Sequence, residues 1–87
     1  MTETDTIANE RILRVREIDP RVRHQVILQL FENLDADGSL QLVVDHDPKP
    51  LRHQLEMRYG AACGWTYLEA GPDLWRVRLR NGGENRA

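Results

Sequence analysis

The segment that most constrains the fold runs from Leu40 to Leu51 and reads LQLVVDHDPKPL. Its first half is a short apolar run, and such a run between turn residues predicts a largely buried β-strand. Its second half predicts a helix start, because Asp47 is a good N-cap residue and Pro48 has no N–H to lose at the first helical position. The strand therefore delivers three polar side chains to the mouth of a helix: Asp45, His46 and Asp47.

Hydrophobic periodicity predicts further elements along the 87-residue chain. Apolar residues alternate with polar ones in the expected strands, and they recur every three or four residues in the expected helices. Asp19 and Pro20 open the first helix in the same way as Asp47 and Pro48 open the second. The order is β-α-β-α-β-β, with strands at 11–17, 40–44, 63–69 and 74–80 and helices at 20–34 and 48–59.

Two successive β-α units favour parallel strands with right-handed crossovers, and the short turn at 70–73 makes the last two strands an antiparallel hairpin. Two helices can cover only one face of the sheet. We therefore expect an α/β (α+β) two-layer sandwich with a mixed four-stranded sheet, formed by one domain at 11–80. Residues 1–10 and 81–87 are expected to be a disordered segment and a flexible tail. The open face is a candidate interaction face that carries five arginines: Arg14, Arg16, Arg76, Arg78 and Arg80.

Composition excludes several classes of protein. No apolar run approaches the roughly 20 residues of a membrane span. The acidic N-terminal residues are unlike a signal peptide, and the lone Cys63 cannot form an internal disulfide, so we expect a cytoplasmic protein. The net charge is −2, and the arginine face lacks exposed aromatics that would stack on bases, so nucleic acid is not expected as a partner.

Both helix N-termini should meet at one edge of the sheet, where open α/β sheets place their ligands. Arg23 lies inside the apolar stripe of its helix, so it needs an acidic partner, for which Asp45 is a candidate, or a ligand. The helix N-termini favour an anion. Alternatively, His24 and His46 are candidate ligands of a transition metal, although no H-x-x-x-H or C-x-x-C spacing supports one. The candidate ligand-binding residues are Arg23, His24, Asp45, His46 and Asp47.

The motif V-x-D-H-D-P-K-P-L, with P-R-V-R-H before it and G-P-D-L-W-R-V-R after it, resembles the bacterial family called domain of unknown function 2249. The similarity covers about residues 13–79, and its most specific part is the D-H-D-P-x-P-L run at 45–51. That family looks like the sulfur-carrier fold of TusA and SirA, which implies strand order 1-2-4-3 with the last strand beside the central one.

Sulfur carriers have a C-P-x-P motif whose cysteine carries persulfide sulfur, but here that place reads Asp19-Pro20-Arg21-Val22. The thiol is missing and Cys63 lies far along the chain, so persulfide transfer by the usual residue is excluded. Members of the family also occur fused to hemerythrin-like iron-binding domains and near nitrogen-oxide metabolism. The resemblance therefore implies a metal or redox protein as partner.

Three functions fit these observations. The first is a small, non-enzymatic binding or regulatory domain whose ligand or metal lies at the helix N-termini. The second is a protein-interaction module that uses the arginine face. The third is a small enzyme with His46 as acid–base group and the two flanking Asp side chains orienting it. This third function is disfavoured because neither a nucleophile nor a deep pocket is expected in two thin layers.

Overall fold

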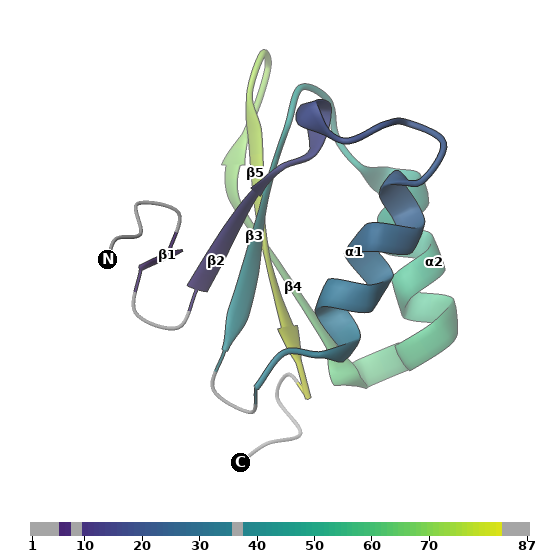
Figure 1. Ribbon diagram of the computed structural model, residues 1–87. Coiled ribbons are helices and arrows are strands. Elements are labelled where there is room, and N and C mark those ends of the chain that lie inside the picture. Colours follow the sequence, from purple (N-terminus) through teal and green to yellow (C-terminus); the bar gives the residue numbers. More distant parts are fainter. Residues whose placement is uncertain (1–5, 8–9, 36–37, 83–87) are drawn as a thin grey trace.

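The computed structural model describes residues 6–7, 10–35 and 38–82 of the chain. The main elements follow the predicted order: β2 (Glu10–Arg14), α1 (Arg23–Glu32), β3 (Ser39–Val44), α2 (Lys49–Tyr59), β4 (Cys63–Ala70) and β5 (Trp75–Asn81). Shorter elements accompany them: the strand β1 (Thr6–Ile7) and the 3-10 turns η1 (Val15–Glu17) and η2 (Gly60–Ala62). Figure 1 shows the sheet as one layer and both helices as a second layer on one side of it.

The strand order in the sheet is β1-β2-β3-β5-β4. β2 and β3 are parallel because α1 forms the crossover between them, whereas β5 is antiparallel to both of its neighbours, β3 and β4. The four longer strands therefore have the predicted mixed order 1-2-4-3, and the α/β two-layer fold is confirmed. The two-residue strand β1 was not predicted, and it pairs antiparallel with β2 at one edge.

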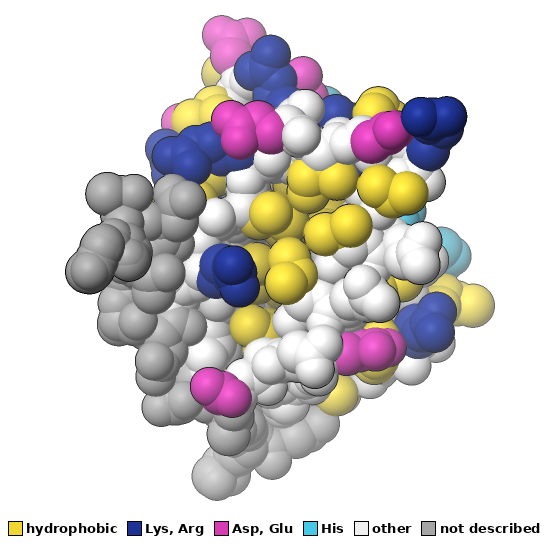
Figure 2. Space-filling model, in the orientation of Figure 1, with side chains coloured by type: hydrophobic (Ala, Val, Ile, Leu, Met, Phe, Trp, Pro, Cys, Tyr) yellow, Lys and Arg dark blue, Asp and Glu magenta, His cyan; other side chains and the backbone are white. Residues whose placement is uncertain are grey.

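The core lies between the sheet and the helices. On β3, Leu42 is fully buried and lies beside Val77 of β5 in the antiparallel register. The helices contribute their apolar stripes to the same core, with Phe31 of α1 and Leu55 of α2 both fully buried. Half-buried hydrophobic residues pack around this core, and Figure 2 shows hydrophobic side chains gathered between β2 and α1. Burial of each large apolar side chain contributes about 1.5–3 kcal/mol, so this layer contact is the main source of stability.

The predicted domain, residues 11–80, is too short at both ends. Glu10, expected in the disordered segment, begins β2 and is only 6% exposed. At the other end, Asn81 belongs to β5, and its side-chain amide donates to the Phe31 carbonyl over 3.0 Å. Residues 1–5, 8–9 and 83–87 lie outside the described residues. The ordered domain therefore includes residues that composition alone assigned to the two ends.

The first predicted strand was too long, because η1 replaces its second half. β2 stays paired with β3 only as far as Arg14, opposite Val43. The chain then turns through η1, which buries Val15 and redirects the backbone toward α1. This turn brings backbone carbonyl groups near the start of α1, where they become part of the candidate site.

The two helix starts also differ from the prediction. α1 begins at Arg23, after a turn in which the Asp19 carboxylate accepts the backbone N–H of Arg21 over 3.0 Å. α2 begins at Lys49, and no side chain caps its N-terminus among the described residues. The N-cap role predicted for Asp47 is therefore wrong. At the other end of α2, Gly60 ends the helix with a φ of 58°, a conformation that glycine adopts readily.

Within the described residues, no helix combines the length and the apolar character that crossing a bilayer requires.

Candidate functional site

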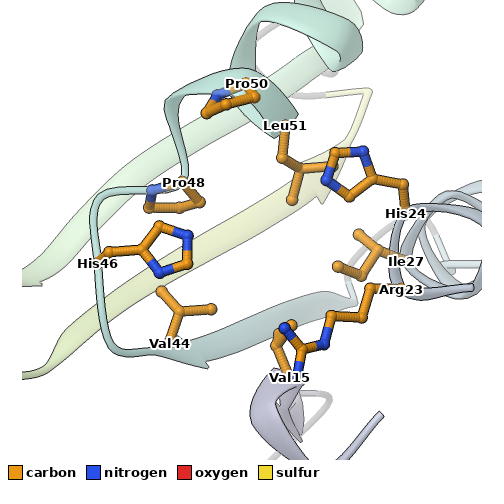
Figure 3. A pocket seen from close by; sticks show the side chains of 9 residues that line it. All are labelled: Val15, Arg23, His24, Ile27, Val44, His46, Pro48, Pro50 and Leu51. Atoms are coloured by element: carbon orange, nitrogen blue, oxygen red, sulfur yellow. The ribbon is translucent and has the colours of Figure 1, made fainter. Parts of the chain in front are cut away.

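A hollow of about 110 Å³ lies at the end of the sandwich where β2 and β3 finish and both helices begin. Its walls come from η1, both helices, β3 and the loop that follows β3 (Figure 3). The lining residues are Val15, Arg23, His24, Ile27, Val44, His46, Pro48, Pro50 and Leu51. No aspartate or glutamate belongs to this lining among the described residues. The hollow therefore combines an apolar interior with three side chains that can carry positive charge.

The guanidinium of Arg23 is held by the backbone of η1. Its Nε donates to the Ile18 carbonyl over 2.7 Å, and its Nη2 donates to the Arg16 carbonyl over 3.2 Å. The predicted pairing of Arg23 with Asp45 is therefore wrong, because the turn of η1 supplies acceptors nearer to the helix start. A guanidinium has five N–H donors. Within the described residues the remaining three have no protein acceptor, so they are open to water or a ligand.

The two histidines lie on opposite sides of the hollow, with His46 on the loop after β3 and His24 on α1 (Figure 3). The Nδ1 of His24 lies 2.9 Å from Oε1 of Gln54, and the Nδ1 of His46 lies 2.7 Å from Oδ1 of Asp45. Since both partners are acceptors, each Nδ1 carries the proton. Each Nε2 is then an acceptor in the neutral ring and a donor in the protonated ring. These contacts orient both rings from outside the hollow.

Asp45 and Asp47 do not line the hollow. The hydrogen bond from His46, together with the nearby charge of Arg16, holds the pKa of the exposed Asp45 carboxyl below its usual range. Asp47 accepts a hydrogen bond from the Tyr67 hydroxyl over 2.7 Å, which ties the loop to β4. The structure thus brings Arg23, His24 and His46 together around one hollow and places the two aspartates behind it.

Sequence reasoning missed the apolar part of the site. Ile27 and Leu51 belong to the core, and their side chains also line the hollow. Periodicity identifies a buried face, but it cannot show where that face stops short of its neighbour and leaves a space.

The N-terminus of α2 is a poor anion site. On α2, Pro48 and Pro50 have no N–H, and the N–H of Lys49 donates to the Asp47 carbonyl over 2.8 Å. Three of the groups that would face a ligand are therefore absent or used. The N-terminus of α2 therefore contributes little to anion recognition in this hollow, because a helix end binds an anion through free N–H groups.

A metal ion at His24 and His46 has no third His, Cys, Asp or Glu ligand in the part of the chain that the structure describes. Among the described residues, no group of three His, Cys, Asp or Glu side chains is arranged to hold a metal ion. Metal binding at these two histidines therefore stays a prediction without structural support.

Cys63 is half-buried at the start of β4. Burial, and after it the charge of Glu56, raises the pKa of its thiol to about 11. The thiol is therefore protonated near neutral pH and is a poor nucleophile.

The open face of the sheet is less positive than the count of arginines suggests. Arg78 forms an ion pair with the buried carboxylate of Glu10. Arg76 donates to Glu69 over 3.0 Å and to the side-chain oxygen of Gln41 over 3.1 Å. Near the end of the sheet, Arg16 lies 3.8 Å from Asp45, and Arg14 also has an interaction partner. The use of this face to bind a partner stays a prediction.

The chain matches the model of a family described as "Uncharacterized conserved protein (DUF2249)" over residues 12–81. It belongs to the DUF2249 family. The matched region of this DUF2249 domain runs from β2 to β5 and contains all five predicted ligand-binding residues. No curated protein and no solved structure matches the chain. The likeness to TusA and SirA, and the link to redox or nitrogen-oxide metabolism, therefore stay predictions.

The D-H-D-P-x-P-L run of this DUF2249 domain forms and orients one side of the hollow. Asp45 orients the ring of His46, and Asp47 anchors the loop to β4 through a tyrosine hydroxyl. Pro48, Pro50 and Leu51 form one wall of the hollow. The motif thus builds one side of the candidate site, while η1 and α1 build the other.

Proposed function

We propose that this DUF2249 domain binds a short organic anion in the hollow between His24, His46 and Arg23. The observation that carries the proposal is the composition of the lining: three side chains able to carry positive charge, an apolar interior, and no carboxylate among the described lining residues. An anionic head group would accept hydrogen bonds from the guanidinium and from the Nε2–H of each imidazole in its protonated form, and its alkyl part would contact Val15 and Ile27.

The volume of the hollow limits the ligand. An apolar cavity of about 150 Å³ holds a benzene molecule. A hollow of about 110 Å³ is therefore suited to a ligand of about four to six non-hydrogen atoms. A short-chain carboxylate such as butyrate has this size and charge, whereas a nucleotide or a peptide segment would leave most of its atoms outside.

Binding is favoured over catalysis because the described residues of the lining include no Ser, Thr, Cys or Lys side chain to act as a nucleophile. The Asp45–His46 pair has the arrangement of an oriented base. Both side chains are more than half exposed, however, and water around them would screen any activation. The proposal therefore assigns to His46 the role of a ligand contact.

A cytoplasmic location is part of the proposal. It is supported by the single cysteine of the sequence, which cannot form an internal disulfide. Cell fractionation followed by immunodetection tests it.

An amide NMR titration of the purified protein with butyrate tests the binding function, with 1-butanol as a neutral probe of similar length. We expect saturable shifts for amides of residues around the hollow with butyrate, and much weaker shifts with 1-butanol. The variants His24→Gln and His46→Gln should each weaken butyrate binding by about fivefold. Each variant removes one imidazole hydrogen bond, which contributes about 1 kcal/mol to the binding free energy.

His53→Gln is the matched control, because His53 is exposed on α2 and does not line the hollow. It should bind butyrate like the unaltered protein. Equal shifts with butyrate and 1-butanol, or equal affinity of all three histidine variants, would refute an anion site in this hollow.

A further inference from the structure

The two edges of the sheet differ in what covers their outer strands. At one edge the two-residue strand β1 covers β2. At the other edge lies β4, which has eight residues and pairs only with β5 among the described residues. Its sequence, CGWTYLEA, contains neither Pro nor Lys, and Glu69 is its one charged residue. Exposed edge strands of monomeric proteins usually carry Pro, Lys or several charged residues. These residues keep another strand from pairing with the free backbone N–H and C=O groups of the edge.

We propose that β4 pairs antiparallel with β4 of a second copy of this chain, so that one continuous sheet crosses a two-fold dimer. The register of β4 against β5 shifts between Tyr67 and Glu69, so the regular part of β4 is Cys63 to Tyr67. A two-fold pairing of this part places its central residue, Trp65, on the symmetry axis. The interface is then isologous, with the same residues contributed by both copies.

Side chains on the helix-covered face suit this register. Trp65 lies opposite Leu79 and Tyr67 opposite Val77 in the β4–β5 register, which places both aromatic rings on the side of the core. Their ring centroids are 6.0 Å apart with an edge-on geometry. Across the axis, Trp65 would meet Trp65 of the second copy, and Tyr67 would lie opposite Cys63. Aromatic cross-strand neighbours of this kind stabilise antiparallel pairs.

Charge on α2 is complementary under the same symmetry. The guanidinium of Arg52 lies 5.8 Å from the ring centroids of both Trp65 and Tyr67, above the second half of the regular segment. Glu56, which pairs with Arg52 over 3.0 Å, lies one turn further along α2, toward the end from which the chain passes through η2 to Cys63. Because the axis sets Tyr67 opposite Cys63, Arg52 of each copy comes to the side of Glu56 of the other.

The proposed dimer is independent of the anion-binding function. No residue of β4 lines the hollow, so both copies would keep their hollows open. Loss of dimerisation and loss of butyrate binding can therefore be observed separately.

Sedimentation equilibrium of the full chain over a wide range of concentrations tests the proposal. We expect a dimer that dissociates on dilution. The variant Glu56→Arg brings like charges together across the axis and should weaken association by about tenfold or more. The double variant Arg52→Glu, Glu56→Arg restores opposite charges at the same places and should recover most of the lost association.

Glu17→Arg is the matched control, because it makes the same charge reversal at an exposed residue of η1 and should leave association unchanged. Amide hydrogen exchange of the unaltered protein gives a second readout that needs no variant: the β4 amides that point away from β5 should be protected at high concentration and lose protection on dilution. A monomer at every concentration, or a dimer that Glu56→Arg does not weaken, would overturn the proposal.

Discussion

The two faces of the sheet are buried by different means. On the helix-covered face, alternate residues of β3 and β5 such as Leu42 and Val77 are fully buried against the two helices. On the other face of the same strands, Gln41 is 6% exposed and belongs to a polar network. One face is held by the hydrophobic effect, which is non-directional, and the other by hydrogen bonds and ion pairs, which require matched partners.

Glu10 is the centre of the polar network. Its carboxylate accepts hydrogen bonds from Ser39 over 3.0 Å and from Gln41 over 3.1 Å, and it pairs with Arg78 of β5. Three strands are thereby linked across the open face by one side chain. The difference between the faces teaches that an open sheet face can be ordered without helices when a buried charge has several partners.

The largest effect is expected on the apolar face. Leu42→Ala should lower the free energy of unfolding by about 3 kcal/mol, because it removes buried methyl groups and leaves a cavity beside Val77. Urea unfolding followed by circular dichroism measures this change. An effect below about 1 kcal/mol would show that the helix layer collapses onto the space, and that the two faces contribute more equally than their burial suggests.

A smaller effect is expected on the polar face. Glu10→Gln keeps the shape of the side chain but removes its charge, and Arg78 loses its ionic partner. Since about a third of the Arg78 side chain remains exposed and water screens it, the free energy of unfolding should fall by about 1–2 kcal/mol.

Arg80→Gln serves as the control for the same face, because this arginine is exposed and should change stability by less than about 0.5 kcal/mol. Equal effects of the two variants in urea unfolding would mean that the ion pair contributes nothing beyond the surface charge.

The smallest expected effect is a dependence of stability on pH, which only the polar face should show. The hydrogen bond from Arg78 is the main cause that lowers the pKa of Glu10 below its ordinary value of 4.5, against the opposing effect of burial. The unfolded chain therefore binds more protons, so this contribution is present above about pH 4.5 and is lost as pH falls through the folded pKa.

Urea unfolding at a series of acidic pH values should show stability falling with pH, and Glu10→Gln should reduce that slope. Leu42→Ala should lower the whole curve without changing its slope, since it alters no titrating group. A Glu10→Gln variant with the slope of the unaltered protein would assign the acid sensitivity to the exposed aspartates Asp19 and Asp45, whose pKa values are also lowered by hydrogen bonds from Arg21 and His46.

Much of the candidate site was predictable in position but not in its contacts. The expectation that two parallel strands bring both helix starts to one end placed Arg23, His24 and His46 near each other, and the hollow lies there. Residue preference favours Asp47 as an N-cap, yet its carboxylate accepts a hydrogen bond from the hydroxyl of Tyr67, 20 positions away, and does not cap the helix. Residue preferences describe local competition, and they cannot include an acceptor or donor that arrives from another strand.

By itself, the sequence determined the order of the two helices and four longer strands, the inward face of these strands and the buried stripe of each helix, because periodic burial of apolar side chains is carried by each segment alone. Only the tertiary structure decided that Arg23 would be held by carbonyl groups of η1 and that Glu10 would pair with Arg78, 68 positions away. Such partners depend on strand register and on where a turn redirects the backbone. Neither is encoded in the spacing of residues within one element, so they appear only when the layers are assembled.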